Sequence, residues 1–450
     1  MKLISMLHNI REIRKNMTLP REDIIKIQNS KLEKIIEHVL KNSNFYKRYY
    51  EKYGITLDNF REVPFENYPL INKEILKNNF DDILCTDDIN KEELENFVSE
   101  EKNWCKKYMD KYMVITSSGS TGSPSIFVYD NDSWDVIKAI AITRTGKYQP
   151  MEFFRKHRIS FIGATLGSFA AVTLLKDLSM RNYLVKTLDA SDPLDENIKA
   201  LNQFKPDTLS GYSSSVSDLA REQINGNLNI APKKIICSAD LLSPEKRAII
   251  TEAFKSDPVN LYAASESLGV ASQIPGRDEL YLFEDFYKIE LVDSRYEEVS
   301  PGKTGEIILT NLFNYTLPLI RYEMEDQLKK SSCQDFNFTL VDEVIGRSVE
   351  NLTFEKKDGT RIEIHGLQFV SMYFKGVKKV QYIQEDRNTL IVKYTGKNDL
   401  EIKNDIFSQI SKLLEQYNLK ESLNIKIERV NEIASDPFTE KYKTIIPYTS

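Results

Sequence analysis

A loop rich in hydroxyl side chains and glycine is the segment of this sequence with the clearest capacity for chemistry. Residues 116–125 read Thr-Ser-Ser-Gly-Ser-Thr-Gly-Ser-Pro-Ser. Backbone N–H groups and hydroxyls in such a loop can converge on one anion, while Gly119 and Gly122 let the backbone turn sharply and approach a ligand. The spacing of a Walker loop and its lysine are absent. From the loop alone, a phosphate cradle and a plain surface turn are equally good interpretations.

The segments around this loop predict an α/β sheet. Apolar runs at 112–115 and 126–129 read as strands on either side of it. From there to about residue 262, short apolar runs alternate with helical stretches, which predicts parallel strands. Ligands of such sheets sit at the carboxyl ends of the strands. We therefore expect one pocket to be surrounded by the loops that follow the strands, at 163–164, 211–213, 238–240 and 263–266.

The length of 450 residues is too great for one ordinary core and predicts more than one domain. The first 110 residues read as mainly helical, with a regular apolar spacing at 21–53, and antiparallel strands are expected at 287–292 and 305–310. After about residue 346 the pattern resets to a small α+β unit, expected as strands 379–385 and 389–394, a helix at 399–417 and a strand at 424–430. We expect domains at 1–345 and 346–450.

Composition excludes several classes of function. The formal net charge is −6, without the basic face that a nucleic-acid partner requires. No run of 18 apolar residues occurs, so we expect no membrane-spanning helix. Residues 1–17 lack a secretory signal, and the four cysteines show neither a Cys-x-x-Cys pair nor a histidine at ligand spacing. A cytoplasmic protein without zinc or disulfides is expected. His157 and His365 are not assigned to the site, and we expect both to be structural in a chain with four histidines.

Further motifs follow the loop in a fixed order. They are the segments 261–266 (Leu-Tyr-Ala-Ala-Ser-Glu), 305–310 (Gly-Glu-Ile-Ile-Leu-Thr), 318–326 (Pro-Leu-Ile-Arg-Tyr-Glu-Met-Glu-Asp) and 346–348 (Gly-Arg-Ser). With the loop at 116–125, they resemble the motifs of the adenylate-forming ligases, in the branch of the phenylacetate–coenzyme A ligases and the CapK-like capsular-polysaccharide proteins. The resemblance implies a large α/β adenylation domain and a small, mobile α+β C-terminal domain.

The resemblance also implies a two-step reaction. A carboxylic acid attacks the α-phosphorus of ATP to give an acyl-adenylate and pyrophosphate, and a thiol of coenzyme A or of a carrier protein's phosphopantetheine arm then takes the acyl group. The small domain would supply Lys441 for the first step, with Lys443 as the alternative, and rotate about a hinge at Glu350 for the second. Glu266 would bind Mg²⁺, and Thr121 would act in the phosphate loop.

The remaining implied roles concern the two substrates. Tyr262 would lie against the adenine, and Asp326 would accept hydrogen bonds from the ribose hydroxyls. The ATP-binding set also includes Ser117, Ser118, Gly119, Ser120, Gly122, Ser238, Ala239, Asp240, Ala263, Ser265 and Arg347. An aryl or acyl group of the acid is expected among small and apolar residues, namely Phe161, Gly163, Ala164, Gly211, Tyr212 and Ser213.

Alternatives remain open at this stage. Taken singly, Glu266 and Asp326 are more commonly surface acids, and a tyrosine in an apolar run, such as Tyr262, is more commonly a core residue. The chain departs from the family pattern at Ser123, where lysine is common, and at Glu325 and Glu440, which replace glycines. Two other hypotheses therefore remain. One is an adenylating enzyme that transfers the acyl group to an amine or hydroxyl in natural-product or surface-polymer biosynthesis. The other, which the departures motivate, is a nucleotide-binding scaffold with altered catalysis. A homodimer through the helical first hundred residues is also possible.

Overall fold

The computed structural model describes most of the chain: residues 2–117, 125–145, 156–178, 183–190, 192–240, 242–345, 352–364, 366–370, 372, 374, 377–396, 400–433 and 444–448. The chain divides into two compact units. The first comprises Met1–Ile115, Ile126–Thr187 and Leu201–Arg347, and the second comprises Thr116–Ser125, Leu188–Ala200 and Ser348–Ser450. The predicted α/β class, with mixed sheets and an α+β C-terminal part, is confirmed. The predicted boundary itself falls on residues 346–351, outside the described part.

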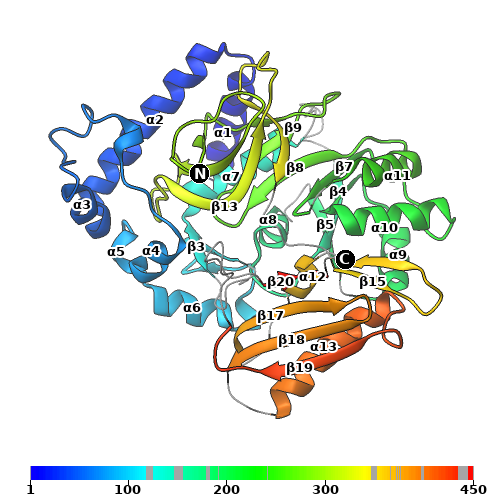
Figure 1. The fold of residues 1–450 in the computed structure, drawn as a ribbon. Helices are drawn as coiled ribbons and strands as arrows, with labels where there is room; N and C mark the ends of the chain where they lie inside the picture. Colours follow the sequence, from blue (N-terminus) through cyan, green and yellow to red (C-terminus); the bar gives the residue numbers. More distant parts are fainter. Residues whose placement is uncertain are drawn as a thin grey trace. The chain divides into compact units, whose positions relative to one another are not determined.

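A large mixed sheet organises the first unit (Figure 1). Its strand order is β11-β12-β13-β14-β10-β9-β8-β7-β6-β4-β5. The predicted parallel strands are confirmed as β4 (His157–Gly163), β6 (Thr208–Tyr212), β7 (Lys234–Ser238) and β8 (Val259–Ala264). The antiparallel part contains β9 (Leu268–Gln273), β10 (Leu280–Leu282), β11 (Tyr287–Val292), β12 (Thr304–Asn311), β13 (Tyr322–Lys330) and β14 (Leu340–Ile345). The edge strand β5 (Tyr183–Asp189) was not predicted.

The helices that follow the parallel strands begin close to the predicted positions. They are α8 (Ala170–Leu178), α10 (Ser213–Ile224) and α11 (Pro244–Phe254), with α9 (Leu194–Phe204) between β5 and β6. Ser243 explains the start of α11, because its side chain accepts a hydrogen bond from the N–H of Lys246 while Pro244 occupies the first turn. The loop expectation at 263–264 was wrong, since both alanines belong to strand β8. The other three expected loops also differ from the prediction, because the strands include Gly163, Gly211 and Tyr212, and Ser238, and Ser213 already belongs to α10.

The N-terminal part of the first unit is mainly helical. They are α1 (Lys2–Asn16), α2 (Arg21–Asn42), α3 (Asn44–Glu51), η1 (Phe65–Asn67), α4 (Lys73–Asn78), α5 (Phe80–Ile83), α6 (Lys91–Ser99) and η2 (Glu101–Asn103), and α7 (Asn131–Arg144) follows later. The predicted helix at 21–53 is confirmed with its interruption at Ser43, whose side chain caps α3 by accepting from the N–H of Tyr46. None of the described helices is long and apolar enough to cross a membrane.

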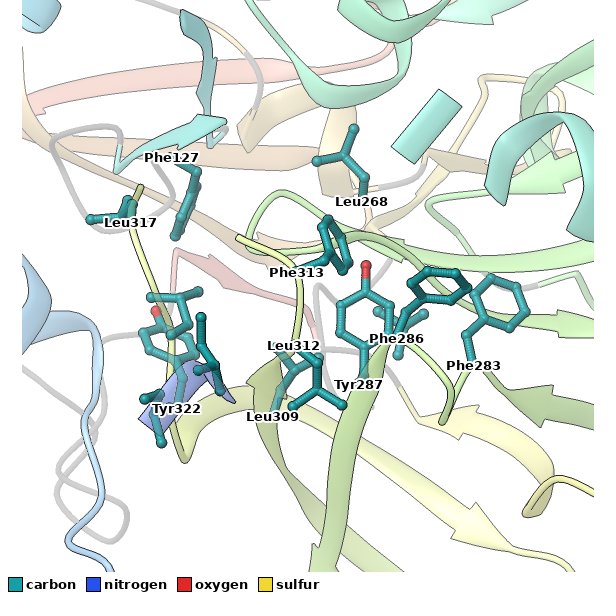
Figure 2. Packing of buried hydrophobic residues seen from close by; sticks show 14 of the residues in the cluster. Phe127, Leu268, Phe283, Phe286, Tyr287, Leu309, Leu312, Phe313, Leu317 and Tyr322 are labelled. Atoms are coloured by element: carbon teal, nitrogen blue, oxygen red, sulfur yellow. The ribbon is translucent and has the colours of Figure 1, made fainter. Parts of the chain in front are cut away.

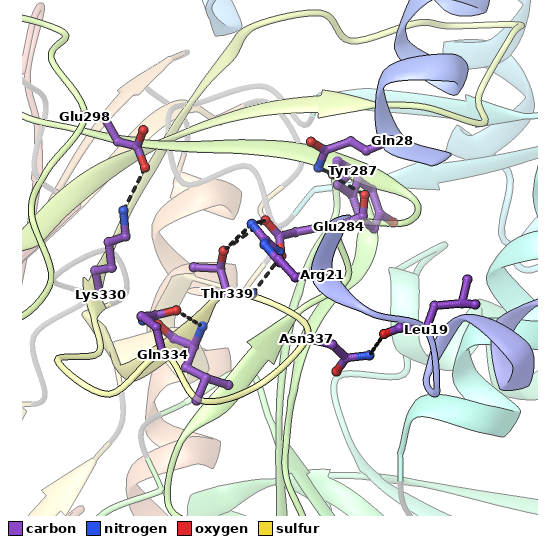
Figure 3. A network of polar contacts seen from close by, with 11 residues as sticks. Leu19, Arg21, Gln28, Glu284, Tyr287, Glu298, Lys330, Gln334, Asn337 and Thr339 are labelled. Atoms are coloured by element: carbon purple, nitrogen blue, oxygen red, sulfur yellow. Dashed lines mark hydrogen bonds and ion pairs between the residues drawn. The ribbon is translucent and has the colours of Figure 1, made fainter. Parts of the chain in front are cut away.

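Polar and aromatic contacts join these helices to the sheet. Arg21 forms an ion pair with Glu284, and Thr339 donates its hydroxyl to the same carboxylate at 2.9 Å (Figure 3). Apolar residues of α1 and α2 also belong to a hydrophobic core in which the ring of Phe313 contacts those of Phe286 and Tyr287 at centroid distances of 6.0 and 5.5 Å (Figure 2). The N-terminal helices are therefore part of the large unit's core.

A fully buried ion pair lies near the same helices. Nη2 of Arg144, the last residue of α7, is 2.6 Å from Oδ2 of Asp285, and neither side chain is exposed. The amide of Asn16 donates to the same carboxylate oxygen at 2.9 Å. The guanidinium also lies 5.0–5.6 Å from the ring centroids of Tyr281, Phe283 and Phe338. The end of α1 and the end of α7 thus meet on one carboxylate.

A small separate sheet carries the hydroxyl-rich loop. It consists of β1 (Lys107–Tyr108), β2 (Tyr112–Thr116) and β3 (Ile126–Tyr129), so both strands predicted beside the loop are confirmed. The ends of the loop are joined by two hydrogen bonds: the N–H of Ser117 donates to the carbonyl of Ser125 at 2.9 Å, and the N–H of Ser125 donates to Oγ of Ser117 at 2.8 Å. Residues 118–124 lie outside the described part.

The second unit contains the predicted small α+β fold. A sheet of order β19-β18-β17-β20 is formed by β17 (Val377–Asp386), β18 (Thr389–Gly396), β19 (Asn424–Arg429) and β20 (Ile445–Ile446), with α13 (Leu400–Gln416). The hairpin β15 (Leu352–Glu355) and β16 (Arg361–Ile364) precedes it, followed by α12 (Gly366–Val370). Buried residues such as Tyr382, Val392, Ile406 and Ile410 give this unit its own core.

Candidate functional site

Two residues predicted to bind the nucleotide are in direct contact. The hydroxyl of Tyr262 on β8 donates a hydrogen bond to Oδ2 of Asp326 on β13 at 2.7 Å. Tyr262 is buried, and Asp326 is half-buried. The two residues are 64 positions apart in the chain. The structure therefore brings the predicted adenine contact and the predicted ribose contact to one place.

A bulge in β13 explains how Asp326 leaves the strand ladder. Glu306 of β12 pairs with Gln327, whereas Ile308 pairs with Glu323, so the segment 324–326 of β13 lies opposite the single residue Ile307. A bulge of this kind bends the strand and redirects a side chain. The strand β9 is also irregular opposite Tyr262, because the pairing shifts between Tyr262 and Ala263. Neither irregularity was predicted from the sequence.

Glu266 lies in the tight turn between β8 and β9. Its side chain is 6% exposed, and its backbone carbonyl accepts a hydrogen bond from the hydroxyl of Tyr129 at 2.9 Å. The hydroxyl of Tyr287 donates to the carbonyl of Ser267, the next residue, at 2.5 Å. Burial raises the pKa of both tyrosines well above the usual value, so both remain proton donors. The turn that carries Glu266 is thus fixed from two sides, and Ser265 lies in the same turn.

The position of Glu266 is compatible with a Mg²⁺ ion that is bound by one protein carboxylate and by the phosphates of a substrate. Within the described residues, no group of three His, Cys, Asp or Glu side chains is arranged to hold a metal ion by itself. Mg²⁺ typically takes one or two protein carboxylates and completes its octahedron with water and substrate phosphates. A single buried carboxylate such as Glu266 fits that mode of binding.

The loop after β7 is bound to the start of α10. The carboxylate of Asp240 accepts hydrogen bonds from the N–H groups of Ser213 and Ser214, the latter at 2.9 Å. The hydroxyl of Ser213 donates to the carbonyl of Asp240, also at 2.9 Å. Ala239 has a φ of +69°, in the left-handed region, and it follows Ser238 at the end of β7. These contacts connect the loop after β7, which the sequence assigned to the nucleotide, with Ser213 at the start of α10, which it assigned to the acid.

Residues predicted for the acid substrate also gather. The rings of Phe161 and Tyr212 meet edge to face with centroids 6.3 Å apart. A Cβ atom on Gly163 would lie 2.7 Å from the ring of Phe161 and 2.9 Å from that of Tyr212. On Gly211, a Cβ atom would lie 2.4 Å from the carbonyl oxygen of Ile162 in β4. Both glycines are therefore required by close packing, and Ala164 directly follows β4.

Other predicted residues cannot be placed. Ser117 is described at the base of its loop, but the following residues lie outside the described part: Ser118, Gly119, Ser120, Thr121, Gly122, Arg347, Glu350 and Lys441. Lys443 and His365 are outside it as well. The ring of His157 stacks on that of Tyr183 with centroids 5.4 Å apart, in keeping with the structural role expected for it.

Sequence reasoning gave no role to Arg321, the arginine of the Pro-Leu-Ile-Arg-Tyr motif. It is 4% exposed and has a φ of +48°. Its guanidinium forms two hydrogen bonds with Glu290, at 2.9 and 3.1 Å, and donates to the carbonyl of Tyr68 at 2.6 Å. Burial raises the pKa of Glu290, an effect that Arg321 opposes. This arginine joins β11, β13 and the N-terminal segment, and it lies five residues before Asp326.

Comparison with known proteins finds several that are similar to this chain. No family model matches the chain. Protein CapK of Staphylococcus aureus is 24% identical over 430 residues, which cover 93% of this chain and 88% of that protein. A phenylacetate–coenzyme A ligase of Thermus thermophilus is 23% identical over 315 residues, 68% of this chain and 65% of the ligase. The fold is similar to that of 2-hydroxyisobutyryl-CoA ligase in complex with 2-HIB-AMP and CoA, with a TM-score of 0.61 at 15% identity over 96% of this chain and 91% of the ligase.

Proposed function

We propose that this chain is an adenylate-forming ligase of the branch that contains the phenylacetate–coenzyme A ligases and CapK, and that it activates a carboxylic acid with ATP. The products of this step are an acyl-adenylate and pyrophosphate. In a second step the thiol of coenzyme A attacks the acyl-adenylate, which forms a thioester and releases AMP. The observation that carries the proposal is the hydrogen bond between Tyr262 and Asp326, at a bulge that removes Asp326 from the ladder.

In this proposal the nucleotide lies against β8 and β13. The ring of Tyr262 contacts the adenine, and the backbone of Ser238 and Ala239 lines the base. Asp326 accepts hydrogen bonds from the ribose hydroxyls, which suits a carboxylate that can accept several hydrogen bonds at once. Hydroxyl groups and N–H groups of residues 117–122 hold the β- and γ-phosphates, since no lysine lies in that loop.

Glu266 is the proposed protein ligand of Mg²⁺. When bound, the ion neutralises charge on the phosphates. The buried position of Glu266 and the two tyrosine hydrogen bonds that fix its turn support this assignment. Lys441 is proposed to stabilise the charge that builds at the α-phosphate, and rotation of residues 346–450 about Glu350 is proposed to separate the two steps.

The acid is proposed to be an aryl or acyl carboxylic acid. The edge-to-face pair of Phe161 and Tyr212, packed over Gly163, supports an apolar contact for the substrate. Ser213 is bonded to Asp240 and offers little to a charged tail.

The direct test measures pyrophosphate release by the purified protein with ATP, Mg²⁺ and a panel of carboxylic acids that starts with phenylacetate. We expect release with at least one aryl or acyl acid, and a thioester when coenzyme A is added. Asp326→Ala is expected to lower the affinity for ATP, whereas the surface variant Asp195→Ala serves as the matched control. A folded protein that binds ATP but releases no pyrophosphate with any acid would favour the scaffold hypothesis.

The acceptor is tested on the same acyl-adenylate. Mass spectrometry of the product distinguishes coenzyme A, a phosphopantetheinylated carrier protein, an amine and a hydroxyl compound when each is offered separately. A thioester with coenzyme A at a rate comparable to pyrophosphate release supports the proposed acceptor. An amide or ester product, with coenzyme A unused, would replace it with the alternative of tailoring chemistry.

A further inference from the structure

The first turn of α10 receives its cap from a distant residue. The N-cap position is occupied by Tyr212, whose side chain makes no capping hydrogen bond. Because a helix begins with N–H groups that have no partner inside the helix, they need an outside acceptor. Asp240, 26 and 27 positions further along the chain, accepts from the N–H groups of Ser214 and Ser213. Its negative charge also suits the positive end of the helix dipole.

The contact between the two loops is buried and has several components. The side chain of Asp240 is fully buried, and Nζ of Lys246 on α11 lies 3.4 Å from its Oδ2. The hydroxyl of Ser213 returns a hydrogen bond to the backbone carbonyl of Asp240. The left-handed φ of Ala239 turns the chain immediately after β7 toward α10. Hydrogen bonds to a charged acceptor are stronger than neutral ones, so this contact fixes the two loops together.

We infer that Asp240 is a positioning residue that fixes the loop after β7, residues 238–240, to the junction of β6 and α10, residues 211–214. The inference rests on the proposed function, which assigns Ser238 and Ala239 to the adenine and Gly211 and Tyr212 to the acid. It assigns the carboxylate of Asp240 to α10 and not to the nucleotide. The inference has a second consequence: the N–H groups of Ser213 and Ser214 are already bonded to Asp240, so these two groups do not bind the carboxylate of the substrate.

The test uses Asp240→Asn in the full-length protein. Asparagine keeps the size of the side chain but has no charge, and it presents an NH₂ group where one backbone N–H needs an acceptor. Loss of one charge-assisted hydrogen bond changes an equilibrium constant roughly tenfold, here the equilibrium between the joined and the separated segments. We expect the Kd for ATP and the KM for the acid each to rise about fivefold to twentyfold, with kcat changed less than about threefold.

Asp130→Asn is the matched control. Asp130 caps α7 by accepting from the N–H and the hydroxyl of Ser133 at 2.8 and 2.6 Å, and it accepts from the hydroxyl of Thr316 at 3.1 Å. It therefore joins a helix start to a distant loop, as Asp240 does, but between segments with no proposed substrate role. We expect a similar loss of thermal stability, with the Kd for ATP and the KM for the acid unchanged.

The outcomes separate the inference from the proposed function. ATP binding is measured by calorimetry, and the acid is phenylacetate or the member of the panel that gives pyrophosphate. If Asp240→Asn is folded and binds ATP as tightly as the unsubstituted protein, the inference is overturned and the proposed function stands. A change in only one substrate, or an equal change in Asp130→Asn, overturns it too. If the unsubstituted protein binds no ATP, the proposed function fails and the inference falls with it.

Discussion

Replacing Tyr262 with phenylalanine tests the contact on which the proposed site depends. The substitution removes only the hydroxyl that donates to Asp326 at 2.7 Å and keeps the ring for adenine. A hydrogen bond to a charged group contributes about 1.5–3 kcal/mol. Part of this is regained when ribose hydroxyls or water take the vacant position, so we expect about 1 kcal/mol of lost ATP binding, or about fivefold in Kd.

The assay compares nucleotides that differ at the ribose. Calorimetric titration with ATP and with 2′-deoxy-ATP gives the discrimination between them. We expect this discrimination to shrink about twofold to fivefold in Tyr262→Phe, because Asp326 is then less well oriented toward the hydroxyls. Tyr68→Phe is the control, since its buried hydroxyl donates to the carbonyl of Phe60 at 2.6 Å, within the N-terminal segment. A folded Tyr262→Phe protein with the ATP affinity and the ribose discrimination of the unsubstituted protein would refute the reasoning.

Three further predictions concern packing, buried charge and thiols. Gly211→Ala should lower the free energy of unfolding by about 1–3 kcal/mol in a urea titration, because its Cβ would meet the Ile162 carbonyl at 2.4 Å. Gly269→Ala, with its nearest contacts at 3.5 Å, should cost less, and equal losses would contradict the packing argument. Asp285→Ala should cost about 3–5 kcal/mol by leaving Arg144 buried without its partner, and a loss under about 1 kcal/mol would speak against this. Burial raises the pKa of Cys85 and of Cys237 to about 12, so both stay protonated at pH 8, and the exposed Cys333 should be the first of the three to react with a thiol reagent. Prompt modification of Cys85 or Cys237 in the folded protein would contradict that expectation.

The sequence predicted the parts of the fold that local patterns encode. Apolar runs separated by helical stretches indicated the parallel strands β4, β6, β7 and β8, and alternation at 379–394 indicated the hairpin β17–β18. Spacing within one segment carries this information, because helix and strand periods are local. The edge strand β5 was missed, although it too is a short run. The family resemblance selected Tyr262 and Asp326, and the structure places them in contact.

The geometry of the site was not predictable in the same way. Residues 322–327, Tyr-Glu-Met-Glu-Asp-Gln, contain no glycine or proline to signal a bulge, since the bulge arises from the pairing of β13 with β12 on either side. The hydrogen bonds of Asp240 with Ser213 and Ser214 join the loop after β7 to the start of α10, and these segments meet only when β6 and β7 pair. Arg321 likewise acquires its partners from β11 and the N-terminal segment. Such roles depend on tertiary contacts, which no single segment encodes.

The bulge in β13 means that this strand carries two residues more than its pairing with β12 uses. A chain shortened by two residues there would form an uninterrupted ladder, with more regular backbone hydrogen bonds. The same deletion would remove the bulge at which the carboxylate of Asp326 meets the hydroxyl of Tyr262. If Asp326 binds the ribose as proposed, regular strand pairing and nucleotide binding make opposite demands on the length of one strand.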